Sequence, residues 1–474
     1  MSVQLLLKNL GKFPSVRHAS SAIASVQEVL KDNGSESNLT SLSNGFHVAS
    51  YSDNKGIATV GVWVDSGAKI ENSDNNGVAS LFEHLLYSGT QKKSGQQLQN
   101  ELAKVGARLS SFSSRDHTAY YAQCLASDVD KVVDILADVI QNTNFTDAQI
   151  EEQRSVVLKK MDEFESNYRE VTFDNLHKTA FQGTPYSLSP LGSKEIVEKL
   201  TKKDIQDYVD DSYKGARMVL AGAGGVDHDA LVRLAEKHFS GVGNGYNRKV
   251  PDPGLKAGTR FTGSEFAYRD DSYPHLFAAL AVEGVPRNHP DYLALQIASQ
   301  AVGQYDKSTQ MSGNAPSQLA QKISAQKSVV AYDNFSLSYD TAGLFGFYFV
   351  SDGHCADETH TTLCTILREW KHLANGVTDK ELVRVKNQLI TNLFSRLETN
   401  TALANYIATE ALYCGKITPL HELERKIHYT NAAAVQGAMT RHAYDRDFAI
   451  SSLGLADALP DWLIIRYSMS SWRL

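Results

Sequence analysis

The segment Gly77-Val-Ala-Ser-Leu-Phe-Glu-His-Leu-Leu-Tyr-Ser-Gly-Thr90 organises the rest of the chain. Its apolar residues recur at the i, i+3, i+4, i+7 and i+8 positions of an amphipathic helix, namely Val78, Leu81, Phe82, Leu85 and Leu86. At about 100° per residue, its polar residues collect on the opposite face, namely Ser80, Glu83, His84 and Tyr87. A helix that only packs on a core does not need a Glu–His pair on its other face. The Glu83–His84 pair therefore indicates a catalytic or metal-binding function for this helix.

The pair has the spacing of H-x-x-E-H, the inverted zinc-protease motif. In that motif two histidines one turn apart bind the metal, and the glutamate activates water. Glu83 and His84 occupy the second half of the motif, whereas Ser80 stands at the first histidine position. The segment predicts a metallopeptidase-like helix that lacks one ligand.

Four sequence words extend this pattern along the chain. They are L-F-E-H-L-L-Y-S-G-T (81–90), R-D-H-T-A-Y-Y (115–121), F-Q-G-T-P (181–185) and R-M-V-L-A-G-A-G-G (217–225). These words resemble the pitrilysin-type metallopeptidase family, and the resemblance covers nearly the whole chain after the first stretch. Within the family, the chain is similar to the branch that contains mitochondrial processing-peptidase β subunits and core protein I of ubiquinol–cytochrome c reductase.

The resemblance also implies where a third metal ligand belongs. In the family it is a glutamate on a later helix with the pattern E-R-x-V-I-x-x-E, which falls on Gln153-Arg-Ser-Val-Val-Leu-Lys-Lys160. Lys160 stands at the ligand position, and Gln153 stands at the position of an accessory acid. Seven residues are close to two helical turns, so both side chains should point the same way. Of the three ligands, only His84 remains.

This ligand set leads us to expect no zinc, no other cofactor and no catalytic residue. Glu83 is the remnant of the general-base position, and His84 is the remnant ligand. An ammonium at a ligand position places a repulsive charge beside a dication, and the loss of metal ligands costs more affinity than the 10–100-fold that outer partners of a ligand contribute. If the two helices meet, we expect Lys160 to form a buried ion pair with Glu83.

Composition limits the classes of function that the chain can have. At 474 residues, the chain suits two to four domains, and its net charge of −7 with a pI near 6.1 argues against a nucleic-acid partner. No apolar run reaches the roughly 18 residues of a membrane span, so we expect no direct span. The four cysteines, Cys124, Cys355, Cys364 and Cys414, form no C-x-x-C pair, which fits a reducing compartment.

The first 25 residues differ in kind from the rest. They contain Lys8, Lys12 and Arg17, several serines and no acid, and four leucines supply an apolar side. This composition is typical of an amphipathic mitochondrial presequence, so we interpret residues 1–25 as one. A tail that happens to lack acids is the alternative.

The remainder contains one unit twice. Strand-like 58–68 and the helix after it match 275–285 and the helix 292–302, and 213–222 matches 444–453. Thr146 and Thr378 each begin a capping box, T-x-x-(Q/E), before a long helix. The sequence therefore predicts a tandem duplication of an α+β unit, with domains at 26–240 and 261–474 and a Gly/Pro-rich linker at 241–260. Each unit should be a mixed, largely antiparallel sheet with helices packed on one face. The family resemblance implies that the two domains face each other across a chamber.

Other candidate segments have plainer interpretations. Residues 107–124 read as two adjacent strands, where active relatives bind extended peptides by β-augmentation, so peptide binding without cleavage stays open. His117 is expected in a hydrogen-bonded turn, and Ala221–Gly225 in a close strand-to-helix turn. His354 and His360 match no zinc spacing. Arg425, Lys426 and Arg441 read as a solvated face.

The chain ends in an apolar stretch, 460–474, that contains Trp462, Ile465 and Trp472. Chain ends fray unless they are tied down, so this one should dock on its own sheet or on another subunit.

The resemblance, together with the broken ligand set, implies a non-catalytic structural core subunit of ubiquinol–cytochrome c reductase (complex III), on the matrix side of the mitochondrial inner membrane. Its implied partners are a homologous core protein II and the cytochrome b, cytochrome c1 and Rieske iron–sulfur subunits. Two alternatives remain. One is a zinc-dependent processing-peptidase β subunit, and the other is a pseudopeptidase that binds presequences.

Overall fold

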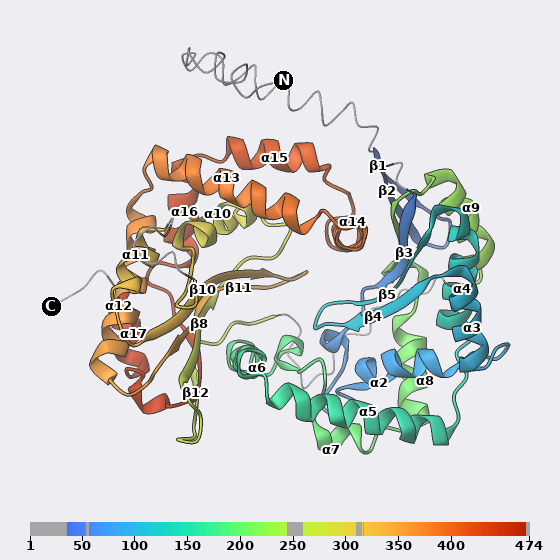
Figure 1. Ribbon diagram of the computed structural model, residues 1–474, viewed down its shortest axis with the longest axis horizontal. Helices are drawn as coiled ribbons and strands as arrows, with labels where there is room; N and C mark the ends of the chain where they lie inside the picture. Colours follow the sequence, from blue (N-terminus) through green and yellow to red (C-terminus); the bar gives the residue numbers. More distant parts are fainter. Residues whose placement is uncertain (1–35, 54–55, 244–258, 310–314, 316, 471–474) are drawn as a thin grey trace, which may run out of the picture.

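The computed structural model describes residues 36–53, 56–243, 259–309, 315 and 317–470. Within these residues the chain forms two six-stranded sheets, one in each half, which face each other with helices between and around them (Figure 1). The first sheet has the order β1-β2-β6-β3-β5-β4, formed by β1 (Glu36–Ser41), β2 (His47–Ser52), β3 (Ile57–Val64), β4 (Arg108–Ser113), β5 (Thr118–Leu125) and β6 (Met218–Gly224). The second has the order β7-β12-β8-β11-β10-β9, formed by β7 (Glu265–Arg269), β8 (Leu276–Glu283), β9 (Gln304–Asp306), β10 (Val329–Ser338), β11 (Gly343–Ser351) and β12 (Ala449–Gly454).

The two sheets are copies of one design. Strands β2, β6, β3, β5 and β4 correspond in order to β7, β12, β8, β11 and β10. In each copy the first two of these strands are parallel, and the other neighbours are antiparallel. The predicted α+β class and the tandem duplication are confirmed.

The helices of the first half are α2 (Val78–Leu85), α3 (Gly95–Val105), α4 (Val129–Gln141), α5 (Asp147–Glu165), α6 (Tyr168–Ala180), α7 (Lys194–Val197), α8 (Lys202–Ser212) and α9 (His228–Phe239). Helices α4 and α9 pack on the outer face of the first sheet. The core between them includes the largely buried central strand β3. Short 3-10 turns lie at Ala68–Ile70, Leu86–Ser88, Ala126–Asp128, Pro185–Ser187 and Gly215–Arg217.

The helices of the second half are α10 (Tyr292–Val302), α11 (Gln318–Ser324), α12 (Ala356–Asn375), α13 (Asp379–Arg396), α14 (Asn400–Cys414), α15 (Leu420–Tyr429), α16 (Ala432–His442) and α17 (Trp462–Ser468), with a 3-10 turn at Ala456–Ala458. The outer core of this half is built around Trp370 of α12, whose ring packs against Phe345 and Phe347 of β11.

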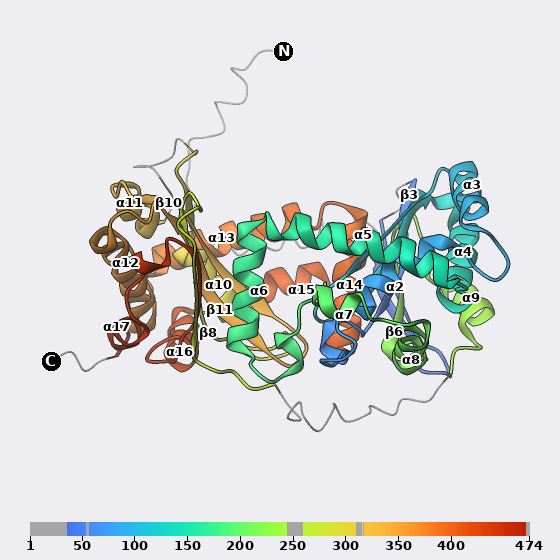
Figure 2. The same ribbon diagram turned by 90° about the horizontal axis from the view of Figure 1, so that it is seen from below.

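One helix of each half packs on the sheet of the other half. Helix α6 leaves the first half and packs on β8 and β12 of the second sheet, where Leu176 and Ala180 join a buried cluster. Helix α14 leaves the second half and packs on β2, β3 and β6 of the first sheet, where Leu403 and Ile407 do the same. Both helices lie between the two sheets (Figures 1 and 2). The prediction that helices cover only one face of each sheet is therefore wrong, because these exchanged helices cover the inner faces.

Several local predictions are confirmed at the residue level. Helix α10 spans Tyr292–Val302 and ends at Gly303, as its pattern indicates. Thr146 forms a complete capping box with Gln149 at the start of α5. The Thr378 side chain accepts from the amide of Glu381 at the start of α13. The predicted strand 58–68 is too long, because β3 ends at Val64 and a 3-10 turn follows.

The chain end docks on its own half. Ile465 of α17 and Met469 are buried in the second core, and Nε1 of Trp462 donates to the carbonyl of Phe448 at 2.8 Å. Leu463, Ile464 and Tyr467 remain exposed. The predicted presequence at 1–25 and Trp472 lie outside the described residues, as does most of the linker at 241–260. The domain limits stay predictions. None of the helices in the described ranges is long and apolar enough to cross a bilayer.

Candidate functional site

Helix α2 is anchored at its start by a buried carboxylate. Glu71 accepts hydrogen bonds from the amides of Gly77 and Ala79, each at 2.8 Å, and from the Asn76 side chain at 2.7 Å. These donors include amides at the helix start that have no partner inside the helix. Burial raises the pKa of Glu71 to about 7, and the same hydrogen bonds oppose that rise. Gly77 has a φ of 98°, and a Cβ there would lie 2.8 Å from the carbonyl oxygen of Leu191. A glycine is therefore required at this entry.

Helix α2 is buried on nearly every side. Helices α5 and α8 and strand β4 all pack against it, so Ser80 and Glu83 are as buried as the apolar stripe. The sequence predicted the two faces of the helix correctly, but it gave no sign that the polar face is covered. That face looks toward α5 and β4 rather than toward open solvent.

Glu83 is held by the edge strand of the first sheet. Its Oε1 accepts from Oγ of Ser111 at 3.1 Å, and Ser111 also bonds the Tyr87 hydroxyl at 2.8 Å. Burial raises the pKa of Glu83, while Lys160, Ser111 and the backbone of Ser113 act in the opposite direction. The general-base position is thus occupied by a carboxylate that a strand hydroxyl already engages.

His84 and Ser80 present polar atoms without partners. Within the described part of the chain, neither Nε2 of His84 nor Oγ of Ser80 has a hydrogen bond, although both atoms are buried. Burial lowers the pKa of His84, and the charge of Lys160 lowers it further.

Helix α5 carries the remaining two positions of the site. Arg154, one residue after Gln153, is buried and fixes the helix by donating to the carbonyls of Val197 and Leu200. Gln153 lines a polar cavity of about 350 Å³ together with Gln96, Gln99 and Gln149. Lys160, two turns further on, is half-buried. Its positive charge acts to lower the pKa of both Glu83 and His84. Helices α2 and α5 thus pack together, and Gln153 lines the cavity that Tyr87 also borders.

The predicted pairing of Lys160 with Glu83 is not a direct contact, and a pairing at longer range stays a prediction. Among the described residues, no nitrogen–oxygen contact of 4.0 Å or less joins the two, and Glu83 bonds Ser111 instead. The physical reason is that β4 supplies a closer neutral donor to the carboxylate. Lys160 still influences Glu83 through space.

A second buried polar network lies where the halves meet, and the sequence did not reveal it. Nζ of Lys69 lies 2.6 Å from Asp65, 2.8 Å from Asp116 and 3.6 Å from Asp340 of the β10–β11 turn. Asp116 also accepts from the Tyr186 hydroxyl and from the Asp340 amide. Burial alone would raise the pKa of Asp116, but Lys69 and these hydrogen bonds hold it below its usual value.

The turn that follows confirms the prediction for His117. Ser114 donates its amide and its hydroxyl to the carbonyl of His117, and Nδ1 of His117 bonds the Tyr413 hydroxyl of α14 at 2.7 Å. Arg115 pairs with Asp174 on α6. The R-D-H word therefore joins the first half to both exchanged helices.

The structure also places the other segments and side chains that the sequence singled out. Ala221–Gly225 forms the end of β6 and the turn before α9, as predicted. His360 contacts Sγ of Cys364 at 3.4 Å. Lys426 pairs with Glu422 on a solvated face. Arg441 is likewise exposed, and it forms a bidentate pair with Asp291.

Comparison with known proteins agrees with this architecture. A family model described as "Insulinase (Peptidase family M16)" matches residues 47–194, and one described as "Peptidase M16 inactive domain" matches residues 199–389. Cytochrome b-c1 complex subunit 1 of Caenorhabditis elegans is 43% identical over 459 residues, which are 97% of this chain and 96% of that protein. The β subunit of the bovine (Bos taurus) mitochondrial-processing peptidase is 38% identical over 440 residues, 93% of this chain and 88% of that protein.

A chain from the structure "Complex III2 from Candida albicans, Inz-5 bound" shares the fold, with a TM-score of 0.81 over 91% of this chain and 99% of that chain at 24% identity. The resemblance predicted from the four sequence words is thereby confirmed. This chain belongs to the M16 peptidase family.

Proposed function

We propose that this chain is a non-catalytic core subunit of the mitochondrial ubiquinol–cytochrome c reductase complex, peripheral to the inner membrane on its matrix side. The observation that carries the proposal is the replacement at two ligand positions, with Lys160 on α5 and Ser80 on α2 beside a single remaining ligand, His84. The full-length likeness to a cytochrome b-c1 complex subunit 1 supports the same assignment.

The donor set argues against a zinc ion at this site. Catalytic zinc is ordinarily bound by three protein side chains and one water, and a hydroxyl or an ammonium replaces neither an imidazole nor a carboxylate. The positive charge of Lys160 lowers the pKa of His84, and the same charge would repel a dication bound there. Glu83, without a metal-bound water to activate, then serves as a hydrogen-bond acceptor for β4.

The remaining structure suits a scaffold. The exchanged helices α6 and α14 and the Lys69 network join the two halves through many contacts between their own residues. Under this proposal the partners are a homologous core protein II and the cytochrome b, cytochrome c1 and Rieske subunits of the complex.

One observation favours a processing peptidase as the second candidate. Glu83 and His84, the acid and one ligand of an active centre, are both present, and the bovine processing peptidase β subunit is similar over most of the chain. A presequence-binding pseudopeptidase is the related alternative, because β4 is an edge strand whose Ser111 already lies beside Glu83.

Zinc content and presequence cleavage separate these functions. Both are measured on the purified chain mixed with its homologous partner, first unchanged and then with Ser80→His and Lys160→Glu together. We expect the unchanged chain to bind no zinc that depends on His84, and the double variant to bind one additional equivalent that does. Stoichiometric zinc with turnover in the unchanged chain would establish the peptidase instead, and saturable presequence binding without turnover would establish the pseudopeptidase.

The matched control is Ser80→His with Lys159→Glu. Lys159 is the exposed neighbour of Lys160 on α5, so this variant makes the same charge change away from the site. It should bind no additional zinc that depends on His84.

A further inference from the structure

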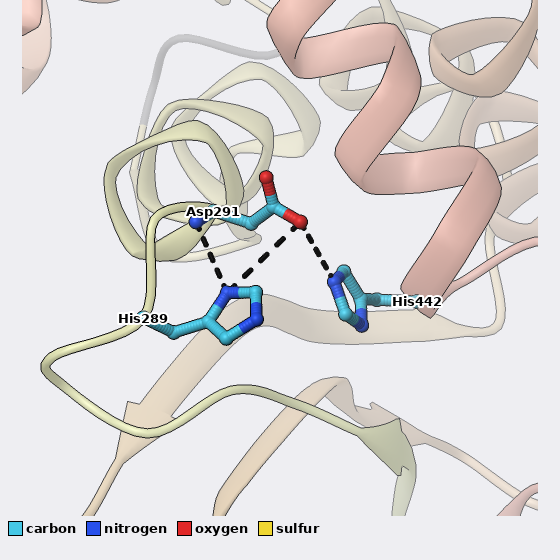
Figure 3. Close-up of side chains that lie close together, drawn as sticks. All are labelled: His289, Asp291 and His442. Atoms are coloured by element: carbon cyan, nitrogen blue, oxygen red, sulfur yellow. Dashed lines mark hydrogen bonds and ion pairs between the residues drawn. The ribbon is translucent and has the colours of Figure 1, made fainter.

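Three potential metal ligands converge in the second half, far from α2 and α5 in the sequence. His289 and Asp291 lie in the turn before α10, and His442 is the last residue of α16. Their side chains point toward one another, as Figure 3 shows. Their ligand atoms lie within 4.8 Å of one another, and they form the only such group of three or more His, Cys, Asp or Glu residues in the described ranges.

The distances place the carboxylate between the two imidazoles. Oδ2 of Asp291 lies 3.0 Å from Nε2 of His442 and 4.0 Å from Nδ1 of His289. The two rings are nearly perpendicular, with centroids 5.6 Å apart. The Asp291 amide donates to Nδ1 of His289 at 3.1 Å, so the lone pair of that nitrogen is engaged by the backbone, and the ring must turn away from the amide before it can bind an ion. Side-chain exposures of 16–36% leave an entry path from solvent.

These distances suit a small cation. In a tetrahedral zinc site with bonds of about 2.0–2.1 Å, neighbouring ligand atoms are about 3.3 Å apart. The observed 3.0 and 4.0 Å bracket that value, so a rotation of His289 would complete the geometry. Two imidazoles and one carboxylate are a donor set that zinc and similar divalent cations favour, with a fourth position left for water.

We propose that His289, Asp291 and His442 form a binding site for a zinc-like divalent cation that ties the start of α10 to the end of α16. The two helices already pack together, so the ion would strengthen an existing contact. The site is independent of the proposed scaffold function, since it uses none of the residues of α2 or α5.

Arg441 is the group that opposes the ion. Its guanidinium contacts both oxygens of Asp291, at 2.8 and 3.0 Å. A carboxylate oxygen has two lone pairs, so Arg441 can keep Oδ1 while the ion takes Oδ2. The Arg441 side chain is 56% exposed, which allows it to move away as the ion enters. The Asp291 carboxylate is thus paired with Arg441 and can still share one oxygen with a dication.

The test is a titration of the metal-free, full-length chain with Co²⁺ alone, followed by its visible d–d absorption, and with Zn²⁺ in competition. We expect one saturable equivalent with nitrogen and oxygen ligands. His442→Gln keeps a donor for Asp291, and His289→Asn keeps an acceptor for the Asp291 amide, so both variants should fold. Each should weaken binding at least about tenfold, because each loses a metal ligand.

Controls locate the ion. His421→Gln, at an exposed position on α15, and His84→Gln should bind as the unchanged chain does. Unchanged binding in both His289→Asn and His442→Gln, or no saturable binding in the unchanged chain, would overturn the proposal. A thiolate-to-cobalt band would do the same by placing the ion on a cysteine.

Thermal unfolding gives a second readout. Zn²⁺ should raise the Tm of the unchanged chain, because an ion that binds only the folded state stabilises it. The rise should disappear in His442→Gln and persist in His421→Gln. An equal rise in all three chains would contradict the assigned site.

Discussion

Nε1 of Trp63 donates a hydrogen bond of 2.9 Å to Oδ1 of Asn405. Trp63 lies on the central strand β3 of the first sheet and is fully buried, whereas Asn405 lies on α14, which comes from the second half. The bond therefore crosses between parts of the chain that are more than three hundred residues apart. The bond lies at the contact surface between the two halves, so we expect it to contribute to the stability of both.

Asn405→Ala should destabilise the protein by about 1–3 kcal/mol, because it leaves the buried Trp63 N–H without an acceptor. Urea denaturation of the full chain measures the change. Asn387→Ala, at an exposed position on α13, is the control and should change stability by less than about 0.5 kcal/mol. Equal effects of the two variants would show that the contact between halves carries no particular weight.

The exchange of helices shows where sequence analysis reaches its limit. The capping box at Thr146 and the stop of α10 at Gly303 were predictable because their causes are local, in turn chemistry and helix periodicity. Helix α14 has a stripe of apolar residues, but such a stripe does not predict which of the two sheets the helix will cover. That choice depends on contacts between residues hundreds of positions apart.

The candidate site divides in the same way. Ser80, Glu83, His84 and Lys160 were placed together from their spacing and from family resemblance, and the structure brings α2 and α5 together. The role of Ser111 was not predictable, since it depends on how β4 packs beside α2. The Lys69 network was missed because its charges come from three distant segments, and each one alone reads as an ordinary surface residue.

Lys69→Met should destabilise the protein strongly. The Lys69 side chain is only 10% exposed, and its removal leaves the buried Asp116 without its cation and Asp65 with only the looser Arg217 pair at 3.8 Å. Loss of one partner of a buried ion pair typically costs about 3–5 kcal/mol. Lys92→Met is the matched control, because Lys92 is 70% exposed and pairs loosely with Asp138 at 3.5 Å. It should cost about 0–1 kcal/mol. The midpoint and slope of denaturant unfolding measure both, and a small effect of Lys69→Met would mean that water reaches the network.

His117 should make stability depend on pH. Burial lowers the pKa of His117 to about 4 from 6.5, so between these values the unfolded chain binds a proton that the folded chain does not. Its contribution is complete above pH 6.5 and is lost as the pH falls toward 4. His117→Gln should therefore flatten the fall in unfolding free energy across this window.

Denaturant unfolding at a series of pH values measures that slope. The reference is His421→Gln, the same substitution at an exposed position on α15. If His117→Gln left the slope unchanged, the ring would not be held neutral by burial.

The charge of Lys160 should be visible in the titration of its neighbours. Lys160 lowers the pKa of His84, where burial is the larger cause, and it opposes the burial-driven rise in the pKa of Glu83. Lys160→Gln removes both effects, so the pKa of each group should move upward. NMR titration of the His84 ring reports the first shift, and the Glu83 side-chain carboxyl carbon reports the second. Lys159→Gln removes an equal charge from the exposed side of α5 and should move neither pKa appreciably. Equal shifts in the two variants would mean that general surface charge acts on the site, whereas a shift confined to Lys160→Gln would identify this lysine as the cation that occupies the electrostatic place of the metal.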